Sequence, residues 1–192
     1  CDCNGSNNGN GVITHGTGAT GRGVYISGGS SLTMYGGSIR GNTLSGSDVK
    51  GAGVYVQNNA TFTMTGGKIS NNTVSGNGAS GAGVYNAGTT TIGGSAVISG
   101  NEMIKPEGTT LYSMDGGGIY TTSGTLTVEG DAQIINNQST GVNSTHGGGI
   151  YVSSGTAELR GNAKVTGNQV GSYGSGICLY GGKLTVSGNV QV

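Results

Sequence analysis

The sequence predicts an all-β protein, a parallel β-helix of about six rungs with roughly 30 residues and three short strands in each rung. A Gly-x-Gly-Val/Ile-Tyr phrase recurs at intervals of 27 to 35 residues. Each copy is followed by a segment in which Thr alternates with an apolar residue, and then by a phrase that ends in Asn. Glycine supplies 44 of the 192 residues and hydrophobic residues only 32%, which excludes one broad apolar core and favours a thin one.

The first element of each repeat is a strand entered through two glycines, which suit a corner with positive φ. Five copies end in tyrosine and a sixth in cysteine: Tyr25, Tyr55, Tyr85, Tyr120, Tyr151 and Cys178. Stacked at the interstrand distance of about 4.8 Å, these tyrosines form a column. An outward column suits sugar rings or a neighbouring rod, whereas an inward column is core, and both orientations stay open.

The second element is the strand in which Thr alternates with apolar residues. Its inward residues form two columns, Leu32, Phe62, Thr90, Leu126, Ala157, Leu184 and Met34, Met64, Ile92, Val128, Leu159, Val186. Its outward residues form two ranks, Ser31, Thr61, Thr89, Thr125, Thr156, Lys183 and Thr33, Thr63, Thr91, Thr127, Glu158, Thr185. Such a face resembles the ice-binding face of insect and bacterial β-solenoid antifreeze proteins, which implies ice binding as one candidate function.

The third element carries an inward aliphatic column, Ile39, Ile69, Ile98, Ile134 and Val165, and ends in Asn42, Asn72, Asn101, Asn137 and Asn168. An Asn side chain at a turn bonds the backbone and the Asn of the next rung, so a ladder is expected. After each Asn we expect a loop of variable length, and the longest runs over residues 102–115.

Residues 1–20 read as an N-terminal cap or an incomplete rung, and residues 21–192 as β-helix repeats that end mid-rung. The expected partners are therefore further copies stacked head to tail, or a longer array of the same repeats. Cys1, Cys3 and Cys178 are candidate assembly contacts through intermolecular disulfides. A lipid attached at Cys1 is the alternative use of that residue.

Charge and hydropathy exclude several classes of function. Eight basic and eight acidic residues give a net charge of zero, without the basic stripe that nucleic-acid binding needs. The sequence contains no run of about 18 apolar residues, so it predicts no membrane-spanning helix. Three cysteines are too few for a disulfide framework and wrongly spaced for zinc, so neither a metal nor a cofactor is predicted.

Catalysis is not predicted, because no pattern of nucleophile, base or paired carboxylates stands out. The repeat alignment places Glu129 over Arg160 as a surface ion pair and Asp131 over Asn162. His15 and His146 are expected to be solvated loop residues without partners. One segment is a candidate ligand loop because it gathers three acidic residues, Glu102, Glu107 and Asp115.

The repeats resemble those of known bacterial surface proteins. The GGGIY phrase followed by an apolar-x-Gly/Asn-Asn phrase is similar to the paired GGAI and FxxN repeats of the polymorphic outer membrane proteins. The run GTLTVEGDAQIINN, residues 124–137, resembles repeats in large surface proteins of gut and oral bacteria. The resemblance implies a right-handed β-helix on a bacterial cell surface or outside the cell, with a structural or adhesive role.

The sequence therefore predicts an extracellular structural or adhesive protein without catalysis, which stacks head to tail into a filament. Its further partners would be glycans or a host surface, bound through the variable loops. A carbohydrate-binding or carbohydrate-cleaving β-helix that uses residues 102–115 is the alternative, and ice binding is the third.

Overall fold

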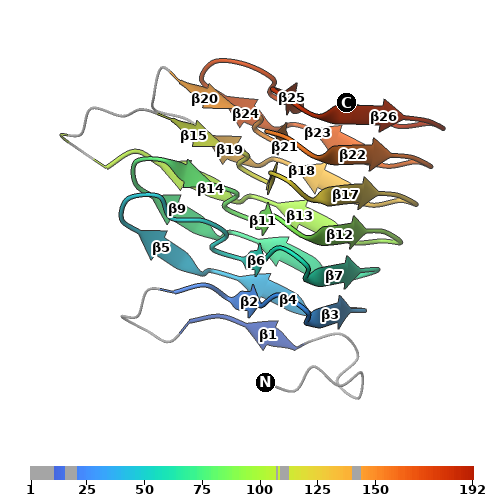
Figure 1. Ribbon diagram of the computed structural model, residues 1–192, viewed down its shortest axis with the longest axis horizontal. Helices are drawn as coiled ribbons and strands as arrows, with labels where there is room; N and C mark the ends of the chain where they lie inside the picture. Colours follow the sequence, from blue (N-terminus) through green and yellow to red (C-terminus); the bar gives the residue numbers. More distant parts are fainter. Residues whose placement is uncertain (1–10, 16–20, 107, 109–112, 140–143) are drawn as a thin grey trace.

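The computed structural model describes residues 11–15, 21–106, 108, 113–139 and 144–192, which form a stack of short parallel strands (Figure 1). Each strand pairs with a strand about one repeat away in the sequence, for example Thr61 opposite Ser31. The pairing is parallel throughout the described strands, and none of these residues is helical. These observations confirm the predicted all-β parallel β-helix.

Three sheets of six strands each run along the stack, as the three predicted elements require. Sheet A contains β1 (Val12–Ile13), β4 (Ser38–Arg40), β8 (Lys68–Ser70), β13 (Val97–Ser99), β18 (Gln133–Ile135) and β23 (Lys164–Thr166). Sheet B contains β2 (Val24–Ile26), β6 (Val54–Val56), β11 (Val84–Asn86), β16 (Ile119–Thr121), β21 (Ile150–Val152) and β25 (Ile177–Leu179). Sheet C contains β3 (Ser31–Met34), β7 (Thr61–Met64), β12 (Thr89–Ile92), β17 (Thr125–Val128), β22 (Thr156–Leu159) and β26 (Lys183–Val186).

The segments after each Asn, expected as loops, also contain strands. Sheet D contains β5 (Thr43–Ser45), β9 (Thr73–Ser75), β14 (Glu102–Ile104), β19 (Gln138–Ser139) and β24 (Gln169–Val170). Sheet E contains β10 (Ala79–Ser80), β15 (Met114–Asp115) and β20 (Thr145–His146). The chain therefore visits sheets B, C, A and D in each complete turn, and also sheet E in the turns that hold β10, β15 and β20.

The main core lies between sheets A, B and C. Sheets A and C supply the predicted inward columns, and sheet B adds residues such as Val54 and Val56 that were in none of them. Val186, predicted to face inward, is 50% exposed in the last turn. Phe62, Leu126 and Ile98 have no exposed surface. Thr90 stands in the column of Phe62 and Leu126, and its hydroxyl donates to Oδ1 of Asn86 at 2.9 Å. The core can contain this polar residue because the nearby Asn86 accepts its hydrogen bond.

A second, smaller core lies beneath sheets D and E. Its buried residues are Ala52, Val74, Ala79, Ala82, Met103 and Met114, with Leu44 and Val49 packed against them. Leu44, Val74 and Met103 lie opposite one another, two residues after Asn42, Asn72 and Asn101, and this column was not predicted because these segments were expected to be loops. Flexible Met side chains fill the space between the smaller residues of this core.

The predicted Asn ladder connects five consecutive turns. The Nδ2 atom of each Asn donates to Oδ1 of the Asn in the next turn, from Asn42 to Asn72 at 2.8 Å, Asn72 to Asn101 at 2.9 Å, Asn101 to Asn137 at 2.9 Å and Asn137 to Asn168 at 3.0 Å. Each Oδ1 also accepts the backbone N–H of the preceding Asn, for example Asn72 N–H to Asn101 at 3.1 Å. The ladder is fully buried from Asn42 to Asn137, and Asn168 is 7% exposed.

The ladder explains the last glycine of each Gly-x-Gly phrase. A Cβ at Gly83 would lie 2.5 Å from the carbonyl oxygen of Gly118 and 3.0 Å from Nδ2 of Asn101. The strand of sheet B therefore approaches the ladder so closely that only glycine fits. The first glycine has another reason, because Gly81 has φ of +64°.

We expect Asn101→Leu to destabilise the fold by about 3 kcal/mol or more, because it leaves the buried N–H groups of Asn72 and the carbonyl of Ile69 without partners. Chemical unfolding measures the change. Asn58→Leu is the matched control, since Asn58 is exposed. A similar loss of stability in both variants would contradict a special role for the ladder.

Candidate functional site

The tyrosines of sheet B form a continuous aromatic stack, hereafter the tyrosine stack: Tyr25, Tyr55, Tyr85, Tyr120 and Tyr151. Successive ring centroids are 5.0, 4.9, 5.3 and 5.1 Å apart, and the ring planes differ by 9° to 28°. In-register parallel pairing sets this spacing, since Tyr55 lies opposite Tyr25 and Tyr85. Each ring therefore contacts the rings of the neighbouring turns.

The tyrosine stack points away from the main core. On β6, Val54 and Val56 are buried in the main core, so the side chain of Tyr55 between them lies on the opposite face. Exposure varies along the stack: Tyr85 and Tyr151 are 7% and 5% exposed, Tyr55 and Tyr120 are half-buried, and Tyr25 is 53% exposed. The orientation that the sequence left open is thus outward, although two of the rings are buried.

A second column runs beside the tyrosine stack, one residue before the first glycine of each phrase. Register places Lys50, Ser80, Asp115, His146 and Tyr173 opposite one another. Lys50 Nζ lies 5.3 Å from the centroid of the Tyr85 ring, and His146 lies 6.0 Å from Tyr151. This column covers the stack and gives it an uneven electrostatic environment.

The N-terminal end of the tyrosine stack is cationic. The Arg22 guanidinium lies 5.0 Å from the Tyr55 ring centroid and 5.9 Å from that of Tyr25. Its Nε–H donates to the carbonyl of Lys50 at 2.8 Å, which fixes the guanidinium over the rings. Together with Lys50 this arrangement makes cation–π contacts with three consecutive tyrosines.

The C-terminal end contains a partly buried polar pair, Asp115 and His146. Nδ1 of His146 lies 2.7 Å from Oδ1 of Asp115, and the hydroxyl of Ser113 donates to Oδ2 at 2.6 Å. The His146 ring also stacks on Tyr173 at 5.7 Å with planes 6° apart. The expectation of a solvated His146 without partners is therefore wrong, because strands β15 and β20 pair and bring the two side chains together.

His15 also has a structural partner. Its backbone N–H donates to Oδ1 of Asn42 at 2.9 Å and so continues the Asn ladder by one turn. The expectation of a solvated loop residue is wrong here too, since His15 is half-buried beside β1.

Cys178 continues the sheet B column opposite Tyr151. It is a free, half-buried thiol, and burial together with the nearby Asp115 carboxylate raises the pKa of Cys178. Tyr180, two residues further on, packs on Tyr151 with ring centroids 6.2 Å apart. Cys1 and Cys3 lie outside the described residues, so the assembly role predicted for the three cysteines stays a prediction.

The acidic segment 102–115 divides between two sheets. Glu102 belongs to β14 of sheet D and lies opposite Thr73 and Gln138, whereas Asp115 belongs to β15 of sheet E. Glu107 lies outside the described residues. In the part of the chain that the structure describes, no three His, Cys, Asp or Glu side chains are grouped in a way that could hold a metal ion.

The outer face of sheet C carries the two threonine ranks in register. Thr61, Thr89 and Thr125 lie opposite one another, and so do Thr63, Thr91 and Thr127. Glu129 and Arg160 lie just beyond the ends of β17 and β22. Arg160 Nε donates to Glu129 at 2.8 Å, and its Nη1 donates at 3.2 Å to Glu158, which lies within the second rank.

The expected pair of Glu129 and Arg160 is therefore present. The hydrogen bond to Glu129, followed by the charge of Glu158, raises the pKa of Arg160. The neighbouring turn position has the expected alignment as well, since Nδ2 of Asn162 donates to Asp131 at 2.9 Å.

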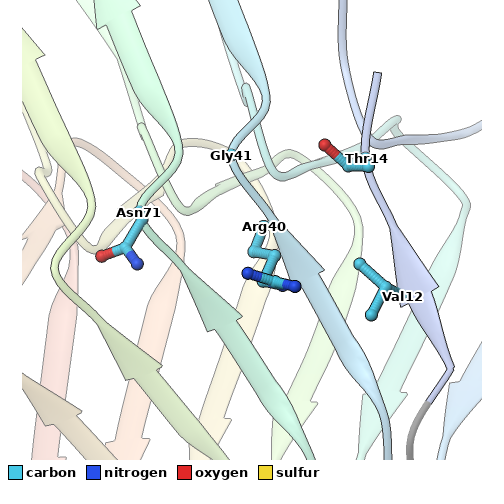
Figure 2. Close-up of a pocket in the computed structure, with 5 residues that line it drawn as sticks. All are labelled: Val12, Thr14, Arg40, Gly41 and Asn71. Atoms are coloured by element: carbon cyan, nitrogen blue, oxygen red, sulfur yellow. The ribbon is translucent and has the colours of Figure 1, made fainter. Parts of the chain in front are cut away.

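The outer face of sheet A has two adjoining shallow depressions around Arg40. Figure 2 shows the Arg40 side chain between Val12 and Asn71, in a depression of about 230 Å³ that Thr14 and Gly41 also line. The second depression, about 430 Å³, shares Val12 and Arg40 and extends along the turn to Lys68. The strands of sheet A carry three cationic residues, Arg40, Lys68 and Lys164, and no acidic residue.

The parallel stack and its side-chain columns define this chain as a β-helical repeat protein. A model of the right-handed β-helix region matches residues 2–190, so the chain belongs to that family. The predicted handedness of the fold agrees with this match. Neither the curated proteins nor the solved structures gave a match. Among the described residues no helix is long and apolar enough to cross a membrane.

Alkaline pH should destabilise the protein through the buried tyrosines. Burial, followed by the charges of Tyr55 and Tyr120, raises the pKa of Tyr85 from 10.0 to about 12. The folded state then holds this proton while the unfolded state releases it, so stability falls as pH rises between those values. We expect the unfolding free energy of Tyr85→Phe to fall less steeply over this range than that of the unmodified protein.

Tyr35→Phe is the matched control, since Tyr35 is 80% exposed. If Tyr35→Phe flattened the alkaline decline as much as Tyr85→Phe, burial in the tyrosine stack would not be the cause.

Proposed function

We propose that this protein is an extracellular, non-catalytic rod with a structural and adhesive role at a cell surface. The observation that carries the proposal is the continuity of its side-chain columns, because the Asn ladder and the tyrosine stack each connect five turns. Such columns hold the outer faces of sheets A and C in fixed register along the rod. A surface that is repetitive and held rigidly suits attachment to an extended partner.

The family contains enzymes as well as non-catalytic proteins, so the choice between these depends on the side chains. Both carboxylate oxygens of Asp115 are engaged, by Ser113 and His146. Glu102 lies in a different sheet. We therefore assign no catalytic role to these residues and place recognition elsewhere.

The depressions around Arg40 favour an acidic saccharide as the partner of the adhesive face. The Arg40 guanidinium presents planar donors that match a carboxylate or a sulfate, and Lys68 adds a second positive charge in the adjoining depression. The side-chain amide of Asn71 and the hydroxyl of Thr14 provide groups that can bond sugar hydroxyls. The site therefore offers two positive charges, from Arg40 and Lys68, and two neutral polar groups, from Asn71 and Thr14, to one acidic oligosaccharide.

A uronic-acid oligosaccharide should therefore raise the midpoint of thermal unfolding, whereas a neutral oligosaccharide of the same length should not. A ligand that binds only the folded protein adds about 2.7 kcal/mol at 100 times its Kd. The double variant Arg40→Gln/Lys68→Gln should lose this stabilisation.

Lys164→Gln is the matched control because Lys164 lies on the same face of sheet A, three strands from Lys68. It should keep the stabilisation. Equal stabilisation by the neutral sugar, or equal loss in Lys164→Gln, would count against the Arg40 site.

Ice binding is the second candidate function, favoured by the flat, in-register threonine ranks of sheet C. We rank it lower because Glu158 and Lys183 place charges within these ranks. Head-to-tail stacking into filaments stays a prediction, which negative-stain electron microscopy of the purified protein can test.

A further inference from the structure

The tyrosine stack belongs to a larger aromatic network that extends through the turns from Tyr25 to Tyr180. At its C-terminal end the network divides, because Tyr151 contacts Tyr180 at 6.2 Å and His146 at 6.0 Å, and His146 stacks on Tyr173 at 5.7 Å. Six tyrosines are therefore connected by direct ring contacts, and His146 links Tyr173 to them. Among these rings Tyr85 and Tyr151 are buried, whereas Tyr173 and Tyr180 are 70% and 77% exposed.

We propose that the tyrosine rings of this network conduct one-electron oxidation toward Tyr180 at its C-terminal end, and that the exposed Tyr173 and Tyr180 are sites of oxidative tyrosine cross-linking between copies of this protein. This inference goes beyond the proposed adhesive role and does not depend on it.

The contacts of the network support transfer from ring to ring. Phenol rings are the most readily oxidised side chains in this chain after the cysteines, and their π-systems overlap in parallel stacks about 5 Å apart. Identical phenols have similar oxidation energies, so an electron can pass from one ring to an oxidised neighbour with little change in energy, provided that the donor phenol releases its hydroxyl proton and the acceptor oxygen takes one up. The in-register strands hold the rings in this arrangement.

Charges beside the network give the transfer a direction. Arg22 and Lys50 place positive charge over Tyr25, Tyr55 and Tyr85, which disfavours loss of an electron from these rings. Asp115 lies at the C-terminal end, paired with His146, whose ring is 6.0 Å from that of Tyr151. Its negative charge favours loss of an electron from the rings at that end, so oxidation moves toward Tyr151 and Tyr180.

Solvent exposure determines where the radical remains. A tyrosine oxidised at neutral pH loses its hydroxyl proton along with the electron and becomes a neutral phenoxyl radical. Burial raises the pKa of Tyr85 and Tyr151, and these phenols release a proton less readily than exposed ones. Tyr173 and Tyr180 reach bulk water, which accepts the proton, and they are also accessible to a second molecule.

The coupling step needs an oxidant, which a peroxidase with hydrogen peroxide supplies. Two phenols, one on each copy, each lose one electron and one proton, and the two phenoxyl radicals join through ring carbons next to the oxygen-bearing carbon. The two ring hydrogens displaced by the new bond return to the oxygens and restore both hydroxyls. Hydrogen peroxide takes up the two electrons and two protons and becomes two molecules of water.

Treatment of the purified protein with peroxidase and hydrogen peroxide tests the proposal. Covalent dimers are counted by electrophoresis under reducing conditions, which removes disulfides, and the linked tyrosines are mapped by mass spectrometry. We expect the links at Tyr173 and Tyr180. Tyr173→Phe/Tyr180→Phe should lose most of the dimer, whereas Tyr35→Phe should keep it, although Tyr35 is 80% exposed.

Tyr120→Phe tests conduction itself. It keeps a ring between Tyr85 and Tyr151 but inserts one that is far harder to oxidise. We expect cross-links at Tyr25 to increase relative to those at Tyr180, because oxidation that begins at Tyr25 no longer leaves that end. Thermal unfolding verifies that the variant is folded. Links at Tyr35 as frequent as those at Tyr180, or an unchanged distribution of links in Tyr120→Phe, would overturn the proposal.

Discussion

The hydrogen bonds between Asn side chains of consecutive turns are the constraint on which the rest of this structure depends. Each ladder oxygen inside the stack accepts two N–H groups, and each amide nitrogen donates to the next Asn and to a backbone carbonyl, as at Asn72. A buried amide that uses all its donors and acceptors is stable only if the next turn lies at the interstrand distance. The ladder therefore fixes the distance and register between turns, and the columns on the other faces follow from it.

This constraint accounts for the residues around the ladder. The residue before each ladder Asn has a positive φ, at Gly41, Asn71, Gly100, Asn136 and Gly167, so only Gly or Asn occurs there. Where Asn71 occupies this position, the glycine in the next turn leaves room for its side chain, because a Cβ at Gly100 would lie 2.6 Å from Oδ1 of Asn71. The occurrence of either Gly or Asn before each ladder Asn is therefore explained by a single turn geometry.

The three main sheets, the Asn ladder and the tyrosine stack could be predicted from the sequence because their residues recur at nearly constant spacing. The small core beneath sheets D and E was not predicted, because the segments after each Asn differ in length and were expected to be loops, although Leu44, Val74 and Met103 align two residues after the Asn. The pair of Asp115 and His146 was missed for a similar reason. Its two strands pair across a segment of variable length, and only the position directly before Gly116 and Gly147 would have aligned them.

The Asn ladder and the tyrosine stack differ in how far their residues and neighbours can be substituted. The Asn ladder is buried and each amide group inside it is fully bonded, so a change there removes several hydrogen bonds at once. The tyrosine stack is held by ring contacts that need only a flat side chain at the right spacing, and its neighbours vary from Lys50 to Asp115 and His146. Because the Asn ladder already sets the register, the column beside the tyrosines can change charge from turn to turn without loss of the fold. That freedom permits a cationic end and an anionic end on one continuous stack, and it is why chemistry is more readily accommodated at the tyrosines than at the asparagines.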